Sequence, residues 1–247
     1  MILEIDIGNT RLKWRLREQQ VRLDQGFVGT EASLDLLAEQ LVTYRDSIRA
    51  VFVVSVVGDL LEQKFADWSV AYLALSPEFV RTGKICGVVR NGYSEPSRLG
   101  VDRWLAINAA YRQIRGSCVV VSCGTAITVD LLSSDGRHLG GYIAPGFRLM
   151  LASLASGARQ IALEKLPAEL SLAPAGTTTG AVCSAVAAMF KGLIDNAVRE
   201  LQQCDVDAGY KIIFTGGDME KLSPFYPQAL LNPDLVLDGI ACILDYP

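Results

Sequence analysis

The stretch Ile2–Lys13 constrains the fold more than any other part of the chain. Apolar and charged residues alternate over Ile2–Ile7 and again over Arg11–Arg17, which is the period of half-buried β-strands. The tripeptide Gly8-Asn9-Thr10 between them is typical of a tight turn. We therefore expect the chain to open with a β-hairpin whose turn carries small, hydrogen-bonding residues.

This hairpin carries groups that suit a polyphosphate. The backbone N–H groups and hydroxyls of a tight turn can bind phosphate oxygens. Lys13 can neutralise their charge, and Asp6 can hold a hydrated Mg²⁺. An ordinary hairpin with a solvated polar face explains the same residues, and for one hairpin alone that explanation is the simpler one.

Composition excludes several classes of function. A net charge of −4 argues against a general nucleic-acid binder. The only histidine is His138, so a multi-histidine metal site is impossible, and the chain has no G-x-S-x-G motif for a serine hydrolase. The six cysteines show no C-x-x-C spacing, and we expect buried thiols.

The sequence also predicts where the protein works. The longest aliphatic run, Val51–Val57, is far too short to span a bilayer. Glu4 and Asp6 stand where a signal peptide needs a basic end. We expect a cytoplasmic protein with neither a membrane nor a nucleic-acid partner.

The second half of the chain repeats the plan of the first without repeating its residues. Each half begins with three strands and a polar turn between the first two, followed by helices and strands. At 247 residues, the chain suits two small domains. We predict an α/β protein with related domains at 1–115 and 116–247, facing a central cleft. Within them we expect short strands at 70–75 and 235–237.

Two further glycine-bearing turns follow predicted strands. Gly124-Thr125 could bind a second part of a phosphate chain, although a plain hairpin turn is about as good an explanation. Thr215-Gly216-Gly217 permits close approach to a flat ring such as adenine, but for this motif alone a plain strand-to-helix connection is the preferred explanation.

The sequence Gly100-Val101-Asp102-Arg103 opens a predicted helix. An acid such as Asp102 is favoured by the helix dipole in the first turn, whereas a cation such as Arg103 is mildly disfavoured there. Bidentate capture of a substrate carboxylate would account for Arg103, and Asp102 could then accept a proton from a hydroxyl. The cluster Thr177–Gly180 precedes a long predicted helix. It could serve only as the N-cap of that helix, or it could bind a polar group of the substrate.

Together, in this order and spacing, these motifs resemble those of the type III pantothenate kinases, members of the acetate/sugar kinase–Hsp70–actin superfamily. The sequence Asp6–Thr10 with Lys13 resembles the first phosphate motif, and Gly100–Arg103 resembles the G-x-D-R substrate motif. Gly124-Thr125-Ala126 resembles the second phosphate motif, and Gly216-Gly217 the adenosine motif.

The resemblance implies two RNase H-like (actin-like ATPase) domains and ATP-dependent phosphorylation of pantothenate to 4'-phosphopantothenate, the first step of coenzyme A biosynthesis. It implies Mg²⁺ with ATP, and a homodimer whose second subunit helps to cover the pantothenate site. Asp102 would be the general base, and Arg103 would face the pantothenate carboxylate. The residues implied for ATP are Asp6, Ile7, Gly8, Asn9, Thr10, Arg11, Leu12, Lys13, Thr125, Gly216 and Gly217. Those implied for pantothenate are Tyr93, Gly100, Val101, Asp102, Arg103 and Thr178.

One position departs from the family pattern. Members often carry Asp two residues before the G-T-A turn, where it binds K⁺ or NH₄⁺, and here that residue is Ser122. A neutral hydroxyl is a much poorer ligand for a cation than a carboxylate. We expect the monovalent-cation requirement to be lost or met differently; Asp130 is a nearby carboxylate whose strand position does not match.

Two other functions fit parts of the sequence. A non-catalytic ATP-binding regulator on the same scaffold would keep Asp6–Thr10 but would not need Asp102 and Arg103 together. A sugar kinase of the same superfamily ranks lower, because the chain is short and Arg103 suits an acid better than a sugar.

Overall fold

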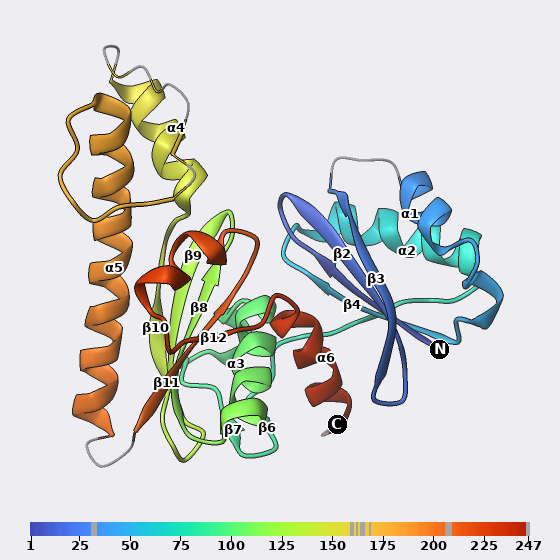
Figure 1. The fold of residues 1–247 in the computed structure, drawn as a ribbon. Coiled ribbons are helices and arrows are strands. Elements are labelled where there is room, and N and C mark those ends of the chain that lie inside the picture. Colours follow the sequence, from blue (N-terminus) through green and yellow to red (C-terminus); the bar gives the residue numbers. More distant parts are fainter. Residues whose placement is uncertain are drawn as a thin grey trace. The chain divides into compact units, whose positions relative to one another are not determined.

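The computed structural model describes residues 1–30, 34–158, 161, 163, 166–167, 169–205 and 209–245. They form two compact units that are discontinuous in sequence (Figure 1). Unit 1 consists of Met1–Cys86, Tyr93–Ala109 and Val236–Pro247, and unit 2 of Gly87–Gly92 and Ala110–Leu235. The division of the chain at residue 115 into two domains stays a prediction.

Each unit contains a five-stranded mixed sheet, and the strand order is the same in both: β3-β2-β1-β4-β5 and β10-β9-β8-β11-β12. In each, the first three strands pair antiparallel and the last two add in parallel. The first sheet's strands are β1 (Ile2–Ile7), β2 (Arg11–Glu18), β3 (Val21–Gly29), β4 (Ala50–Ser55) and β5 (Glu78–Phe79). The second sheet's are β8 (Ser117–Cys123), β9 (Ala126–Leu132), β10 (His138–Pro145), β11 (Tyr210–Thr215) and β12 (Leu230–Leu231).

Six α-helices and a small two-stranded ribbon, with four short 3₁₀ turns between these elements, complete the described part of the chain. The helices are α1 (Leu34–Leu41), α2 (Asp59–Leu73), α3 (Val101–Ile114), α4 (Phe147–Gly157), α5 (Thr178–Cys204) and α6 (Leu235–Asp245). The ribbon consists of β6 (Ile85–Cys86) and β7 (Val89–Arg90).

The sheet of unit 1 has two unlike faces because successive side chains of β1 point to opposite sides. Leu3, Ile5 and Ile7 form a core with residues of α1 and α2. On the other face, the fully buried Glu4 accepts hydrogen bonds from Arg15 Nε at 2.6 Å and Arg17 Nε at 2.9 Å. The alternation expected for this hairpin is therefore confirmed, and its charged face is a buried ion-pair network.

The C-terminal helix α6 belongs to unit 1. Arg15 Nη1 donates to Asp238 Oδ1 at 2.5 Å, and Leu237 and Ile240 are buried against Leu105 of α3. The strand expected at 235–237 is wrong, because those residues form the first turn of α6. A short apolar run does not by itself distinguish a strand from a buried helix.

The strand expected at 70–75 is also wrong, since α2 continues to Leu73 and ends at Ala74 in the left-handed conformation. Trp68 and Tyr72 lie one helical turn apart and stack with ring centroids 5.3 Å apart. This packing over the unit 1 core outweighs the β-propensity of the local sequence.

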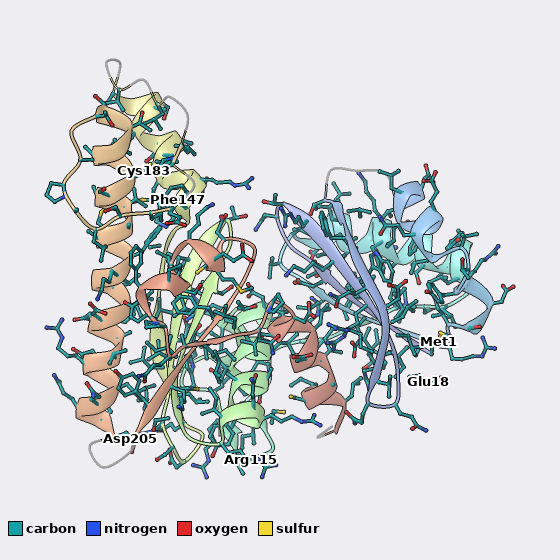
Figure 2. All side chains as sticks on the ribbon, viewed as in Figure 1. Met1, Glu18, Arg115, Phe147, Cys183 and Asp205 are labelled. Carbon is teal, nitrogen blue, oxygen red and sulfur yellow. The ribbon has the colours of Figure 1, made fainter. Side chains whose placement is uncertain are left out.

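In unit 2, α4 and α5 cover one face of the sheet. Figure 2 labels Phe147 at the start of α4 and Cys183 on α5, and both lie in one core with Val121 and Phe214 of the sheet. Among the described helices, α5 alone is long and apolar enough to cross a membrane by length and composition. Most of its buried residues belong to this core, which explains its apolar character.

The cysteine prediction is confirmed for five of the six thiols, which are buried; Cys204 is exposed. Burial raises the pKa of Cys118 and of Cys123 to about 12, so both stay protonated at neutral pH.

Candidate functional site

The hairpin of β1 and β2 places its two functional charges opposite each other. Asp6 and Lys13 are direct partners in the antiparallel register, so their side chains share one face of the sheet. The turn is held by Gly8 N–H, which donates to Arg11 O at 3.0 Å, and by the Thr30 hydroxyl, which donates to Gly8 O at 2.6 Å. The turn residues Asn9 and Thr10 are exposed.

Asp6 has an electrostatic environment that disfavours its charge. Burial raises the pKa of Asp6 from 3.8 to about 6; Lys13 opposes the rise and Asp102 adds to it. Two carboxylates and one ammonium, from β1, α3 and β2, therefore interact within unit 1. A cation beside Asp6 would relieve the electrostatic cost of ionising it.

The G-x-D-R sequence forms the start of α3. Gly100 O accepts the N–H of Trp104 at 2.9 Å, which places Asp102 in the first helical turn. A Cβ atom at Gly100 would lie 2.7 Å from Asp102 Oδ1. The carboxylate of Asp102 thus folds back over the backbone of Gly100, into space that only a glycine leaves open.

Arg103 is 5% exposed, and its guanidinium is held by Tyr93. Arg103 Nη1 donates to the Tyr93 hydroxyl oxygen at 2.8 Å, and Arg103 Cζ lies 5.6 Å from the centroid of the Tyr93 ring. The hydrogen bond and the ring contact together fix the orientation of a planar cation. An oriented guanidinium is a good receptor for a carboxylate.

In unit 2, the turn between β8 and β9 carries Gly124 and Thr125. Gly124 N–H donates to Ala126 O at 3.0 Å, and the side chain of Thr125 is exposed. Gly216, at the end of β11, has φ of 88° and lies so close to β8 that a Cβ atom on it would be 2.4 Å from Cys123 O. Asp218 N–H, beyond Gly217, donates to the same carbonyl at 2.9 Å. The second phosphate motif and the adenosine motif are therefore neighbours.

Two other predicted positions have local structural explanations. Thr178 is the first residue of α5, whose N-cap Thr177 accepts the N–H of Gly180 at 3.2 Å. Ser122 is partly buried in β8, with Thr128 of β9 and Thr215 of β11 as its register partners. Three hydroxyls thus form a row across the end of the sheet.

Sequence reasoning overlooked Gly146, the N-cap of α4. Its N–H donates to Thr125 O at 2.9 Å, so it directly supports the turn at Gly124-Thr125. The dipeptide Pro145-Gly146 before a helix was the available signal, but it also fits an ordinary connection.

Over the described residues, no group of three His, Cys, Asp or Glu side chains is placed to hold a metal ion.

Comparison with known proteins identifies the family. The family model described as type III pantothenate kinase matches residues 2–200. The chain belongs to the type III pantothenate kinase family. A type III pantothenate kinase from Cellvibrio japonicus is 36% identical over 246 residues, covering 99% of this chain and 97% of its own. One from Pseudomonas aeruginosa is 36% identical, covering 98% of each chain. A type III pantothenate kinase is a phosphotransferase, so the prediction of a kinase is confirmed.

Solved structures confirm the fold. A protein from Campylobacter jejuni assigned to the Baf family of transcriptional activators superposes with a TM-score of 0.61 at 22% identity, covering 98% of this chain and 97% of its own. A protein from Sinorhizobium meliloti assigned as a 2-dehydro-3-deoxygalactonokinase superposes with a TM-score of 0.60 at 12% identity, covering 98% of both chains. At these identities the likeness carries the fold alone, and the expected actin-like ATPase fold is confirmed.

Proposed function

We propose that this chain transfers the γ-phosphoryl group of ATP to the hydroxyl of pantothenate, giving 4'-phosphopantothenate and ADP at the first step of coenzyme A biosynthesis. Family membership over residues 2–200 supports this activity. The observation that carries it at the site is the pairing of Asp6 with Lys13 in the hairpin register, together with the raised pKa of Asp6, to which Asp102 contributes. A phosphate-binding hairpin and a candidate base influence each other there, as a phosphoryl transfer requires.

Asp102 acts on the acceptor. It takes the proton of the pantothenate hydroxyl as that oxygen bonds to the γ-phosphorus and the bond to ADP breaks. Arg103, oriented by Tyr93, binds the pantothenate carboxylate and so fixes the distance between the hydroxyl and Asp102. Gly100 and Val101 supply the backbone beside the acceptor, and Thr178 supplies a hydroxyl.

The hairpin and the second turn bind ATP. Lys13 and the turn residues Gly8-Asn9-Thr10 bind phosphate oxygens, and Thr125 binds another part of the phosphate chain. Gly216-Gly217 lets the backbone approach the adenosine. Phosphoryl transfer needs little covalent participation by the protein, so these contacts work by orientation and charge neutralisation.

Asp6 fits a magnesium ion. Its carboxylate is partly buried, and burial raises its pKa, so a divalent cation beside it would offset the cost of ionising it. When bound, Mg²⁺ neutralises developing charge on the phosphate oxygens, with Asp6 holding the ion through water.

The remaining properties are proposed from the family. The protein works in the cytoplasm as a homodimer, with the second subunit covering the pantothenate site. Because Ser122 stands where family members often carry a carboxylate, the requirement for K⁺ or NH₄⁺ is lost or met differently.

The test is ADP release by the purified protein with pantothenate present or omitted, repeated with Mg²⁺, Mn²⁺ and Ca²⁺. The proposal expects release that depends on pantothenate and on a divalent ion, with 4'-phosphopantothenate identified by mass. ATP binding without pantothenate-dependent turnover would instead identify a regulator, and turnover with sugars alone would identify a sugar kinase.

A further inference from the structure

The turn between β8 and β9 is enclosed by two glycine backbones. On one side lies Gly146, at the start of α4; a Cβ atom there would be 2.2 Å from Gly124 O and 2.6 Å from Thr125 O. On the other side lies Gly216, whose Cβ would be 2.4 Å from Cys123 O. All three distances are shorter than a carbon–oxygen contact permits, so neither glycine position has room for a side chain.

Backbone hydrogen bonds also join the turn to the segments that contain Gly146 and Gly216. Gly146 N–H donates to Thr125 O at 2.9 Å, and Asp218 N–H donates to Cys123 O at 2.9 Å. Two carbonyls that flank Gly124 are thus each held by a backbone donor from a different element. We call the set Cys123–Thr125, Gly146 and Gly216 the glycine clamp.

Gly146 does not need to be glycine for conformational reasons. Its φ of −70° and ψ of 175° are extended values that any residue adopts. Its requirement is spatial, because the atoms that a Cβ would meet belong to the backbone and no rotamer change can remove them. A methyl group at 146 must therefore push α4 and the phosphate turn apart.

We propose that Gly146 is a positioning residue for the ATP site, acting through the backbone of Gly124-Thr125. The proposal rests on the function proposed above, in which Thr125 binds the phosphate chain. Displacing that turn moves the Thr125 contacts away from the nucleotide and leaves the acceptor groups Asp102 and Arg103 on unit 1 unaltered. The loss should therefore fall mainly on the nucleotide, because Thr178 on α5 is the one proposed pantothenate contact in unit 2.

The experiment compares Gly146→Ala with Gly157→Ala in the full chain. Gly157 lies at the other end of α4, is exposed, and has no atom within 4 Å of its Cβ position, so it is a matched control. In Gly146→Ala we expect the KM for MgATP to rise about tenfold while the KM for pantothenate stays within about twofold. Gly157→Ala should keep both values. A folded Gly146→Ala enzyme with an unchanged KM for MgATP would overturn the proposal, as would an equal rise in both KM values.

If circular dichroism shows that Gly146→Ala does not fold, a second measurement is needed. Hydrogen exchange on the wild-type protein then decides, with and without a non-hydrolysable ATP analogue and Mg²⁺. We expect the analogue to slow exchange in 124–126 and in 146–150 together. Protection of the first segment without the second would overturn the clamp. A wild-type chain that binds the analogue but shows no pantothenate-dependent turnover would refute the proposed activity and leave the clamp to be judged by exchange alone.

Discussion

The turns that follow β1 and β8 occupy the same place in two sheets of identical strand order, yet they present different chemistry. In unit 1, Asp6 pairs in register with Lys13, so a carboxylate faces an ammonium. In unit 2, Ser122 holds the matching place, two residues before the turn glycine, and pairs with Thr128. At this matching position, one topology therefore carries a charged pair in one unit and an uncharged pair in the other.

The two turns also differ in how tightly they are enclosed. A Cβ atom at Gly8 would come no closer than 3.3 Å to any other atom, whereas the turn at Gly124 is pressed between Gly146 and Gly216. We infer that unit 1 works through side-chain charge and unit 2 through backbone position. Unit 1 should therefore be sensitive to substitutions that alter charge, and unit 2 to substitutions that alter volume.

The largest expected effect comes from the candidate base. Asp102→Asn keeps the shape of the side chain and removes its ability to accept a proton, so kcat should fall roughly 10²–10⁴-fold. Asp59→Asn is the matched control, because Asp59 is an exposed acid in the first turn of α2. A near wild-type kcat for Asp102→Asn would remove Asp102 from the role of base.

The next effect concerns the geometry of that base. In Gly100→Ala, the new Cβ would overlap Asp102 Oδ1, which lies 2.7 Å away at the end of a movable side chain. The carboxylate can turn away at little cost to folding, so we expect kcat to fall about tenfold or more with the melting temperature nearly unchanged. A loss of stability with kcat intact would show that Gly100 serves the helix start and not the base.

Arg103→Lys should weaken pantothenate binding more than ATP binding. Lysine keeps the charge but lacks the planar fork that Tyr93 orients, and we expect the KM for pantothenate to rise about tenfold. The KM for MgATP should change by less than about twofold. Arg98→Lys, at an exposed ion pair with Glu95, is the control. Equal changes in both KM values would argue against carboxylate recognition by Arg103.

The difference between the two turns also explains which features of the fold and the candidate site could be predicted from the sequence. Strand alternation predicted both hairpins, since each residue's face follows from its place in the strand. The charged residues Asp6, Lys13, Asp102 and Arg103 could be predicted as candidate functional residues. Burying or orienting a charge costs free energy, so a charge at such a position usually has a function. The support given by Gly146 was not predictable, because it depends on a close approach between segments about twenty residues apart. A glycine required for space looks the same in sequence as a glycine in any turn.

The pH dependence of stability tests the charged site directly. The pKa of Asp6 is about 6 in the folded protein, against an ordinary value of 3.8. At a pH between these two values, the native state still holds a proton that the unfolded chain has released. The free energy of unfolding should therefore decrease as pH rises from about 4 to about 6. Asp6→Asn lacks this titrating group. Between pH 4 and pH 7.5, its free energy of unfolding should therefore rise by on the order of 1–3 kcal/mol relative to that of wild type. Urea melts of both proteins without nucleotide measure this. A constant difference across that range would show that Asp6 ionises normally.

The smallest effect belongs to the uncharged row of unit 2. With Ser122 in place of a carboxylate, replacing K⁺ and NH₄⁺ by Na⁺ or Tris should leave turnover within about twofold of its starting value. Ser122→Asp sharpens the comparison, because it puts a carboxylate at the position in unit 2 that matches Asp6. The partly buried carboxylate would need a counter-ion, so turnover of this variant should become dependent on K⁺. If the wild-type enzyme already lost its activity without K⁺ and NH₄⁺, hydroxyl and carbonyl oxygens would suffice to bind the cation, and the contrast between a charged and an uncharged unit would fail at this position.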